Sequence, residues 1–218
     1  MQSFDKFISS VINHIPALVV GSFILNGILF FTATAGWESY WDMKKQAEDA
    51  HAIIAQADAK HQELEAITTY IRKLRPDLNP AIRVEWAQAF QKGSEETGVD
   101  PFVALQFSIV ESGLKMVGPY GTTLVSHAGA EGIMQVMPQY WGTGQIDFIK
   151  KPQDLRHPTL NIRAGMYILA TYYAQCGQNW YNAALCYHGG QRALVRPKKS
   201  SISYAEKITK RLSLPIEV

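Results

Sequence analysis

Glu111 is the residue in this sequence best suited to acid chemistry. It follows the apolar run 102–110, which we expect to form a helix that is apolar nearly all round and therefore buried. A carboxylate at the C-terminal end of a buried helix is disfavoured both by desolvation and by the helix dipole. Such a group retains its proton, and a retained proton is what the acid-catalysed cleavage of a glycosidic bond requires. Taken alone, however, a Glu that ends a helix is more commonly a surface residue.

The segment 126–138 adds polar and small residues about two dozen positions later. Gly129, Ala130 and Gly132 permit a close approach of the backbone. Gln135 interrupts an apolar, strand-like stretch and offers both a donor and an acceptor, as sugar amides and hydroxyls require. The plainer interpretation of the same segment is a β-turn followed by an edge strand.

The elements around these residues are predicted to be helices separated by loops. One helix begins at Pro80 and is capped by Gly98, and the next begins at Asp100-Pro101. Asn161 is predicted to cap a helix that runs to Cys176, and a further helix runs from about Trp180 to Tyr187. The stretch from 113 to 129 is loop-like.

With these pieces in order, the chain resembles the soluble lytic transglycosylases, whose catalytic domain is goose-lysozyme-like. The resemblance covers roughly residues 80–212. It implies a mainly α, lysozyme-like α+β catalytic domain with a small β segment. The matching pieces are Glu111-Ser112, residues 125–130, Gly132-Ile133-Met134-Gln135-Val136-Met137-Pro138, residues 161–165, residues 184–190 and Tyr204 within 203–208.

The resemblance also implies residue roles. Glu111 would be the catalytic acid and base, with Tyr187 beside it to position substrate and Tyr204 to support the site. The family usually has Asn directly after the tyrosine that matches Tyr187, where this chain has His188. This imidazole could replace the amide hydrogen bond or add a titratable group. The residues that would line the sugar groove are Ser126, Met134 and Gln135.

The reaction implied by the resemblance is non-hydrolytic cleavage of the MurNAc–GlcNAc β-1,4 bond in peptidoglycan, with formation of a 1,6-anhydro ring. One carboxylate suffices for it, whereas most glycosidases need two. Glu131 is the acid that could instead activate water, and we expect it at the surface. A hydrolytic muramidase and a catalytically weak, wall-binding structural protein of a membrane assembly stay open as alternatives. No metal or organic cofactor is implied.

An uncharged, mostly apolar run extends from Ile15 to Gly36 and is followed by Trp37, Tyr40 and Trp41. At ~1.5 Å per helical residue it just spans a hydrocarbon core of ~30 Å. We therefore expect residues 1–36 to anchor the chain in a membrane through residues 15–37. The prediction is a single pass through the inner membrane with the catalytic domain in the periplasm. A cleaved signal peptide, ending near the small residues 33–35, and a virion component delivered to the host envelope are the alternatives.

Residues 37–74 are predicted to form one long helix, because no Gly or Pro follows Gly36 until Pro76. Its apolar residues recur at heptad spacing between Met43 and Leu74, with Gln46 and Lys60 as interruptions. This pattern weakly favours a coiled coil, so residues 43–74 could mediate self-association or lie along the following domain. Residues 37–78 would be a spacer, and residues 79–218 the catalytic domain.

The composition of the chain adds little to the function inferred from these motifs. The chain has 218 residues, 47% of them hydrophobic, and a net charge of +2, which is too small to imply nucleic-acid binding. Basic residues nevertheless crowd the C-terminal end. We interpret this basic cluster as a solvated face. The alternative is that it binds an anionic polymer such as cell wall. We expect Cys176 and Cys186 to be two separate buried thiols, and a disulfide between them is the alternative.

Overall fold

The computed structural model describes residues 37–118, 121–140 and 146–215. By its internal contacts the chain divides into two units, Met1–Gln62 and Glu63–Val218. Within the described residues no helix is both long enough and apolar enough to cross a membrane. The proposed anchor at 15–36 lies outside them, so the membrane span stays a prediction.

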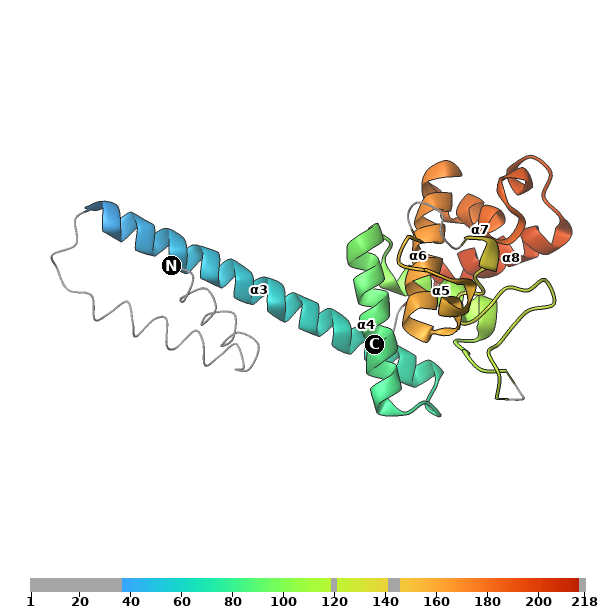
Figure 1. The fold of residues 1–218 in the computed structure, drawn as a ribbon. Coiled ribbons are helices and arrows are strands. Elements are labelled where there is room, and N and C mark those ends of the chain that lie inside the picture. The colour runs from blue at the N-terminus through green and yellow to red at the C-terminus, as the bar shows by residue number, and fades with distance from the viewer. Residues whose placement is uncertain (1–36, 119–120, 141–145, 216–218) are drawn as a thin grey trace. The chain divides into compact units, whose positions relative to one another are not determined.

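Helix α3 (Trp37–Leu74) confirms the long helix expected from the sequence (Figure 1). The boundary between the two units falls inside it, at Gln62. Its last turns belong to the second unit, where Ile67 and Ile71 are fully buried in the hydrophobic core. These heptad positions therefore pack against the chain's own domain, and self-association through residues 43–74 stays a prediction.

Helices α4 (Pro80–Thr97) and α5 (Pro101–Ser112) begin and end where the sequence indicates. The Asn79 side chain accepts the Ala81 N–H, and Asp100 accepts the N–H groups of Phe102 and Val103. Gly98 and Gly113 end the two helices in the left-handed conformation that glycine adopts without strain. Asp100 and Gly113 thereby fix both ends of the helix that carries Glu111.

The segment between α5 and α6 holds the small β component, which consists of the isolated bridges Val117–Thr123, Val125–Glu131 and Glu131–Val136. The strand-like stretch predicted after Gly132 is instead a tight turn closed by the Glu131–Val136 bridge. Gln135 adopts a positive φ of 49° in this turn. That angle is incompatible with a strand, so the prediction of an edge strand was wrong here. The short 3-10 helices η1 (Pro138–Tyr140) and η3 (Pro152–Arg156) follow.

The C-terminal part consists of α6 (Pro158–Gln175), α7 (Trp180–Gly189), the 3-10 helix η4 (Gln191–Leu194) and α8 (Lys199–Leu212). Helix α6 begins three residues before Asn161, so Asn161 lies inside the helix and does not cap it. Helix α5 packs against α4 and α8, and α7 packs against α6 and α8. The mainly α class is confirmed.

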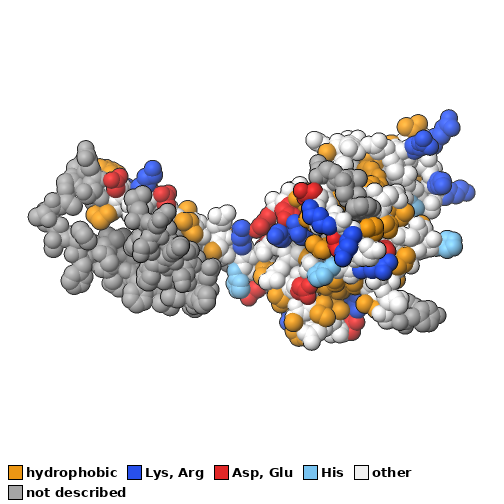
Figure 2. All heavy atoms as spheres, in the orientation of Figure 1, with side chains coloured by type: hydrophobic (Ala, Val, Ile, Leu, Met, Phe, Trp, Pro, Cys, Tyr) orange, Lys and Arg blue, Asp and Glu red, His pale blue; other side chains and the backbone are white. Residues whose placement is uncertain are grey.

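A disulfide joins Cys176, at the end of α6, to Cys186 in α7, with a sulfur–sulfur distance of 2.15 Å. The preference for two separate thiols was therefore wrong. The bond closes the α6–α7 connection and ends one residue before Tyr187. On the face seen in Figure 2, Lys and Arg side chains lie beside Asp and Glu side chains over part of the second unit and without them at its far right edge.

Candidate active site

Glu111 lies in the last turn of α5 and is half-buried. Desolvation raises the pKa of its carboxyl to about 7, and a hydrogen bond from Tyr204 opposes that rise. The Tyr204 hydroxyl donates to Oε1 of Glu111 across 2.5 Å. Burial thus favours the acid form while the phenol favours the anion. A group poised between the two near neutral pH can both give and take a proton.

Tyr204 and Tyr187 enclose this acid from α8 and α7. Burial, and secondarily the charge of Glu111, raises the pKa of both phenols, so both stay neutral at working pH. Their rings meet Phe107 of α5 edge-on, with centroids 5.6 Å away for Tyr187 and 6.3 Å away for Tyr204. The aromatic contact fixes the two helices against the one that carries the acid.

Tyr187 also connects the acid's helix bundle to the turn 131–136. Its hydroxyl donates to the backbone carbonyl of Met134 across 2.8 Å. From the other side, Ser112 Oγ donates to the carbonyl of Ile133, also across 2.8 Å. The turn is therefore fastened both to α7 and to the residue directly after Glu111.

Asn161 has a structural role that differs from the helix cap predicted from the sequence. It is fully buried in α6, where its Oδ1 accepts the Met134 N–H and its Nδ2 donates to the carbonyls of Glu131 and Leu155. Gly132 sits so close that a Cβ there would lie 2.6 Å from Asn161 Nδ2, and its φ is 77°. A buried amide must find polar partners, and Asn161 finds them in the backbone that precedes α6.

Comparison with known proteins fits this geometry. A family model described as the transglycosylase SLT domain matches residues 88–210, more than half of the chain. The chain belongs to this family.

Among solved structures, the X-ray structure of an inactive mutant of lytic transglycosylase Slt from Pseudomonas aeruginosa matches with a TM-score of 0.51 and 18% identity. The match covers 78% of this chain but only 33% of that one, so the chain spans about a third of that protein's length. At this identity the likeness shows a shared fold. The search of curated proteins gave no match.

In this SLT-domain chain, the side chains of two predicted groove residues form hydrogen bonds within the turns that contain them. Gln135 Nε2 donates to the carbonyl of Gly132 across 2.8 Å, and Ser126 Oγ accepts the Ala130 N–H across 2.9 Å. Both side chains are partly exposed. Their contact with sugar stays a prediction, and each has a structural role in shaping the segment 126–136.

Met134 does not line a groove with its side chain, contrary to expectation. The side chain is fully buried, with its sulfur 2.7 Å from Ser108 Oγ. Gly165 makes room for it, since a Cβ at that position would lie 2.4 Å from the Met134 Cβ. The contribution of Met134 to the site is its backbone, which binds both Tyr187 and Asn161.

His188, where the family usually has Asn, packs against the supporting tyrosine. Its ring centroid is 4.9 Å from that of Tyr204, and its Nδ1 shares a hydrogen bond of 3.1 Å with Ser201 Oγ. Burial lowers the pKa of the imidazole, so it is mostly neutral at neutral pH. The ring packs against Tyr204, whose hydroxyl donates to Glu111 of α5.

Glu131 is buried, not at the surface as expected, with only 6% of its area exposed. Its two oxygens accept hydrogen bonds from Nε and Nη2 of Arg156, each 3.3 Å long. Arg156 thus compensates the buried charge. No group of three or more His, Cys, Asp or Glu side chains that could hold a metal ion occurs within residues 37–118, 121–140 and 146–215.

Proposed function

We propose that this protein is a peptidoglycan lytic transglycosylase that cleaves the MurNAc–GlcNAc β-1,4 bond and forms 1,6-anhydroMurNAc. The observation that carries the proposal is the pKa of about 7 at Glu111, whose carboxyl is desolvated and receives one phenolic hydrogen bond. Membership of the SLT-domain family supports the substrate class.

In the proposed reaction, protonated Glu111 donates its proton to the oxygen that links C1 of MurNAc to GlcNAc, and the C1–O bond breaks. The 6-hydroxyl oxygen of the same MurNAc bonds to C1, and its proton passes to the Glu111 carboxylate. The acid is thereby regenerated and no water is consumed. Tyr204 stabilises the transient carboxylate, which is the form its hydrogen bond favours.

Glu131 is a poor candidate for the second carboxylate of a hydrolase. Retaining and inverting glycosidases place two carboxyl groups on either side of the scissile bond. The oxygens of Glu131 are instead engaged by Arg156. This pairing supports the intramolecular reaction over the muramidase alternative.

We propose that the catalytic domain works in the periplasm, held at the inner membrane by residues 15–37. The Cys176–Cys186 disulfide supports an oxidising compartment, because such bonds persist outside the reducing cytoplasm. Alkylation of free thiols before and after reduction in spheroplasts tests the compartment. A protein that is fully alkylated without prior reduction would overturn it.

We further propose that cutting is local, in the service of a phage or of a secretion or conjugation machine, with a virion component as the alternative. The combination of an expected anchor, a long helix and one small catalytic domain supports this proposal. Fractionation tests it: the protein should copurify with such an apparatus, and an even distribution along the envelope would contradict it.

The test of the reaction is product analysis by mass spectrometry on purified sacculi. The wild type should release anhydromuropeptides, Glu111→Gln should release none, and Glu131→Gln should still release them at the activity of its folded fraction. If the only products carried reducing-end muramic acid, the protein would be a muramidase and not a lyase. Wall binding without turnover by the wild type would identify a binding protein.

A further inference from the structure

The connection between α7 and α8 carries four cations and no acid. We call residues 190–199, which include η4 and the first residue of α8, the α7–α8 loop, and it lies at the edge of the second unit (Figure 1). The sequence contains no Asp or Glu between Asp154 and Glu206. None of the four cations has an ion-pair partner in the part of the chain that the structure describes. All four are exposed, and they are Arg192, Arg196, Lys198 and Lys199.

Two aliphatic side chains of the same loop face solvent. Val195 is 83% exposed, more than any other large hydrophobic side chain among the described residues, and Leu194 is 38% exposed. The Ala193 N–H donates to the carbonyl of Gly190 across 2.9 Å, and the Val195 N–H donates to that of Arg192 across 3.2 Å. The small side chain of Ala193 is buried. The hydrogen-bonded turn therefore buries its smallest apolar residue and presents the two larger ones to solvent.

The two lysines of the loop lie at the electrostatically unfavourable end of a helix. Lys198 is the N-cap of α8 but makes no capping hydrogen bond with its side chain, and Lys199 is the first helical residue. The first turn of α8 contains no acid. A helix N-terminus carries a partial positive charge, which cations oppose and anions stabilise. An anion bound from outside would therefore relieve an unfavourable placement of charge.

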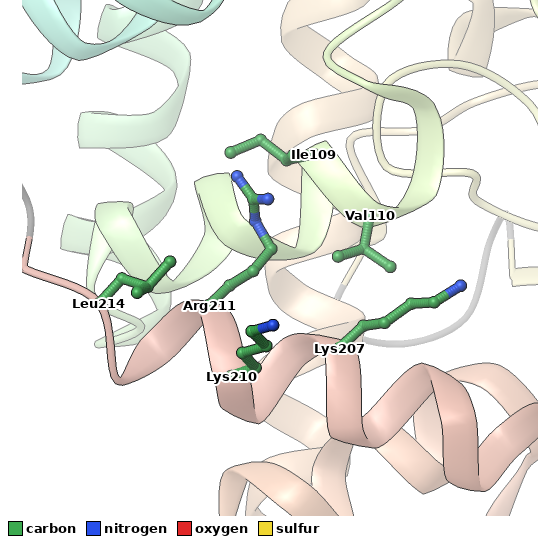
Figure 3. Close-up of a pocket in the computed structure, with 6 residues that line it drawn as sticks. All are labelled: Ile109, Val110, Lys207, Lys210, Arg211 and Leu214. Carbon is green, nitrogen blue, oxygen red and sulfur yellow. The ribbon is translucent and has the colours of Figure 1, made fainter.

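The cations at the opposite end of α8 are arranged differently. Lys207, Lys210 and Arg211 line a pocket against α5 (Figure 3). Nε of Arg211 donates to Oε1 of Gln106 across 2.9 Å. Lys210 and Arg211 lie in the last turn of α8, where the helix dipole favours cations. The unfavourable charges and the protruding aliphatic residues thus coincide only in the α7–α8 loop.

We infer that the α7–α8 loop binds the surface of an anionic lipid membrane. Val195 and Leu194 enter the interfacial layer, and the four cations contact the lipid phosphates. Interfacial contacts of proteins combine buried apolar area with attraction to anionic lipids, and the loop supplies both.

Other anionic partners fit the loop less well. A wall polysaccharide pairs with cations but offers no apolar layer to a side chain as exposed as Val195. A stable interface with another protein buries about 800 Å² per partner, far more than two aliphatic side chains provide. The inference depends neither on the proposed reaction nor on the expected anchor at residues 15–37.

The test follows the loop in the full chain. Ser200→Cys, at an exposed position beside the loop, carries an environment-sensitive fluorophore, and labelling is specific because the two native cysteines form a disulfide. The chain, with its N-terminal apolar run shielded by a nonionic amphipathic polymer, is titrated with vesicles of phosphatidylcholine with or without phosphatidylglycerol. We expect a blue shift and about tenfold tighter binding when phosphatidylglycerol is present. Equal affinity for the two kinds of vesicle, or binding to neither, would overturn the inference.

Variants of the loop separate its charge from its apolar residues. Lys198→Gln/Lys199→Gln should weaken vesicle binding about 10- to 30-fold, because each cation near an anionic surface contributes about fivefold. Val195→Ser should weaken it about five- to tenfold through the lost apolar burial. The control Lys207→Gln/Lys210→Gln removes the same charge from exposed positions about 12 Å along α8, beyond the screening length of ~8 Å, and should bind nearly as the parent does. An equal loss in the control would assign the binding to net charge and overturn the inference.

A second titration distinguishes the membrane from the wall. Soluble peptidoglycan fragments replace the vesicles, and a stronger response of the Ser200→Cys fluorophore to fragments than to anionic vesicles would assign the loop to the wall and overturn the inference. Turnover of sacculi without lipid should be unchanged in Val195→Ser, whether or not the products are those of the proposed reaction. A fall in turnover in this variant would show that Val195 contacts the glycan, and it too would overturn the inference.

Discussion

Glu111 and Glu131 are two carboxyl groups of one small domain, and each is paired with a different kind of side chain. Glu111 receives a hydrogen bond from a neutral phenol, whereas Glu131 faces the guanidinium of Arg156. A cation compensates a buried carboxylate, and a phenol does so only in part. Glu111 therefore has a pKa of about 7 and can exchange a proton, while Glu131 is an ionic contact that secures the turn 131–136.

The largest effect should come from removing the exchangeable proton. Glu111→Gln keeps the shape of the side chain, but the amide cannot transfer a proton to the glycosidic oxygen. Turnover of sacculi should therefore fall by about 10²- to 10⁴-fold. Release of muropeptides over time measures it. Glu131→Gln is the matched control, and an equal loss of turnover per folded molecule in that variant would abolish the distinction between the two acids.

Glu111→Gln should also stabilise the fold at high pH. The folded-state pKa of about 7 exceeds the ordinary value of 4.5, so the folded state binds the proton more tightly. Stability is therefore lost as pH rises from about 4.5 to 7, by up to about 3 kcal/mol, and Gln removes this loss. Urea unfolding at pH 4 and pH 8 measures it. A variant with no gain at pH 8 relative to pH 4 would contradict the burial argument.

Tyr204→Phe sharpens the comparison by leaving Glu111 without its hydrogen bond. Because that bond lowers the pKa of Glu111, its loss should move the alkaline limb of the pH–rate profile to higher pH. The rate should fall about 10- to 100-fold, in line with a hydrogen bond to a charged group. If the alkaline limb of the pH–rate profile did not shift in Tyr204→Phe, the hydroxyl of Tyr204 would not control the pKa of Glu111.

Arg156→Gln tests the other acid. It leaves Glu131 buried without its cation, and because the Arg156 side chain is 55% exposed, we expect a loss of only about 1 kcal/mol in the free energy of unfolding. Urea unfolding measures it, and turnover per folded molecule should be unchanged. A change in the reaction products would instead give Glu131 a part in catalysis.

The smallest effect is expected at His188. His188→Asn restores the residue that the family usually has, but removes a ring packed on Tyr204. We expect a rate change of about two- to threefold, comparable to a weak aromatic contact. The comparison variant His188→Ala should lower the rate further. Equal rates in all three proteins would show that His188 neither replaces the amide nor supports Tyr204.

Local signals in the sequence predicted the helices well. Asp100-Pro101 and Gly113 bound α5, and the caps place Glu111 in its last turn whatever the rest of the chain does. The family resemblance predicted only that Tyr204 supports the site, and the structure shows its hydrogen bond to Glu111, 93 positions away. No periodicity encodes such a pairing.

Three of the errors concern groups whose state depends on distant partners. Glu131 was placed at the surface because its sequence neighbours do not reveal Arg156. Asn161 looked like a helix cap, yet it holds the backbone of the turn before α6. Cys176 and Cys186 pair because α6 and α7 pack together, which the count of two cysteines does not decide.

The most direct test of the account is a carbon-13 NMR titration of the Glu111 side-chain carboxyl in the full chain, assigned by comparison with Glu111→Gln. The account predicts a titration midpoint near pH 7. A midpoint near the ordinary 4.5 would show that Glu111 is already ionised at working pH, and it would remove the acid on which the proposed reaction depends.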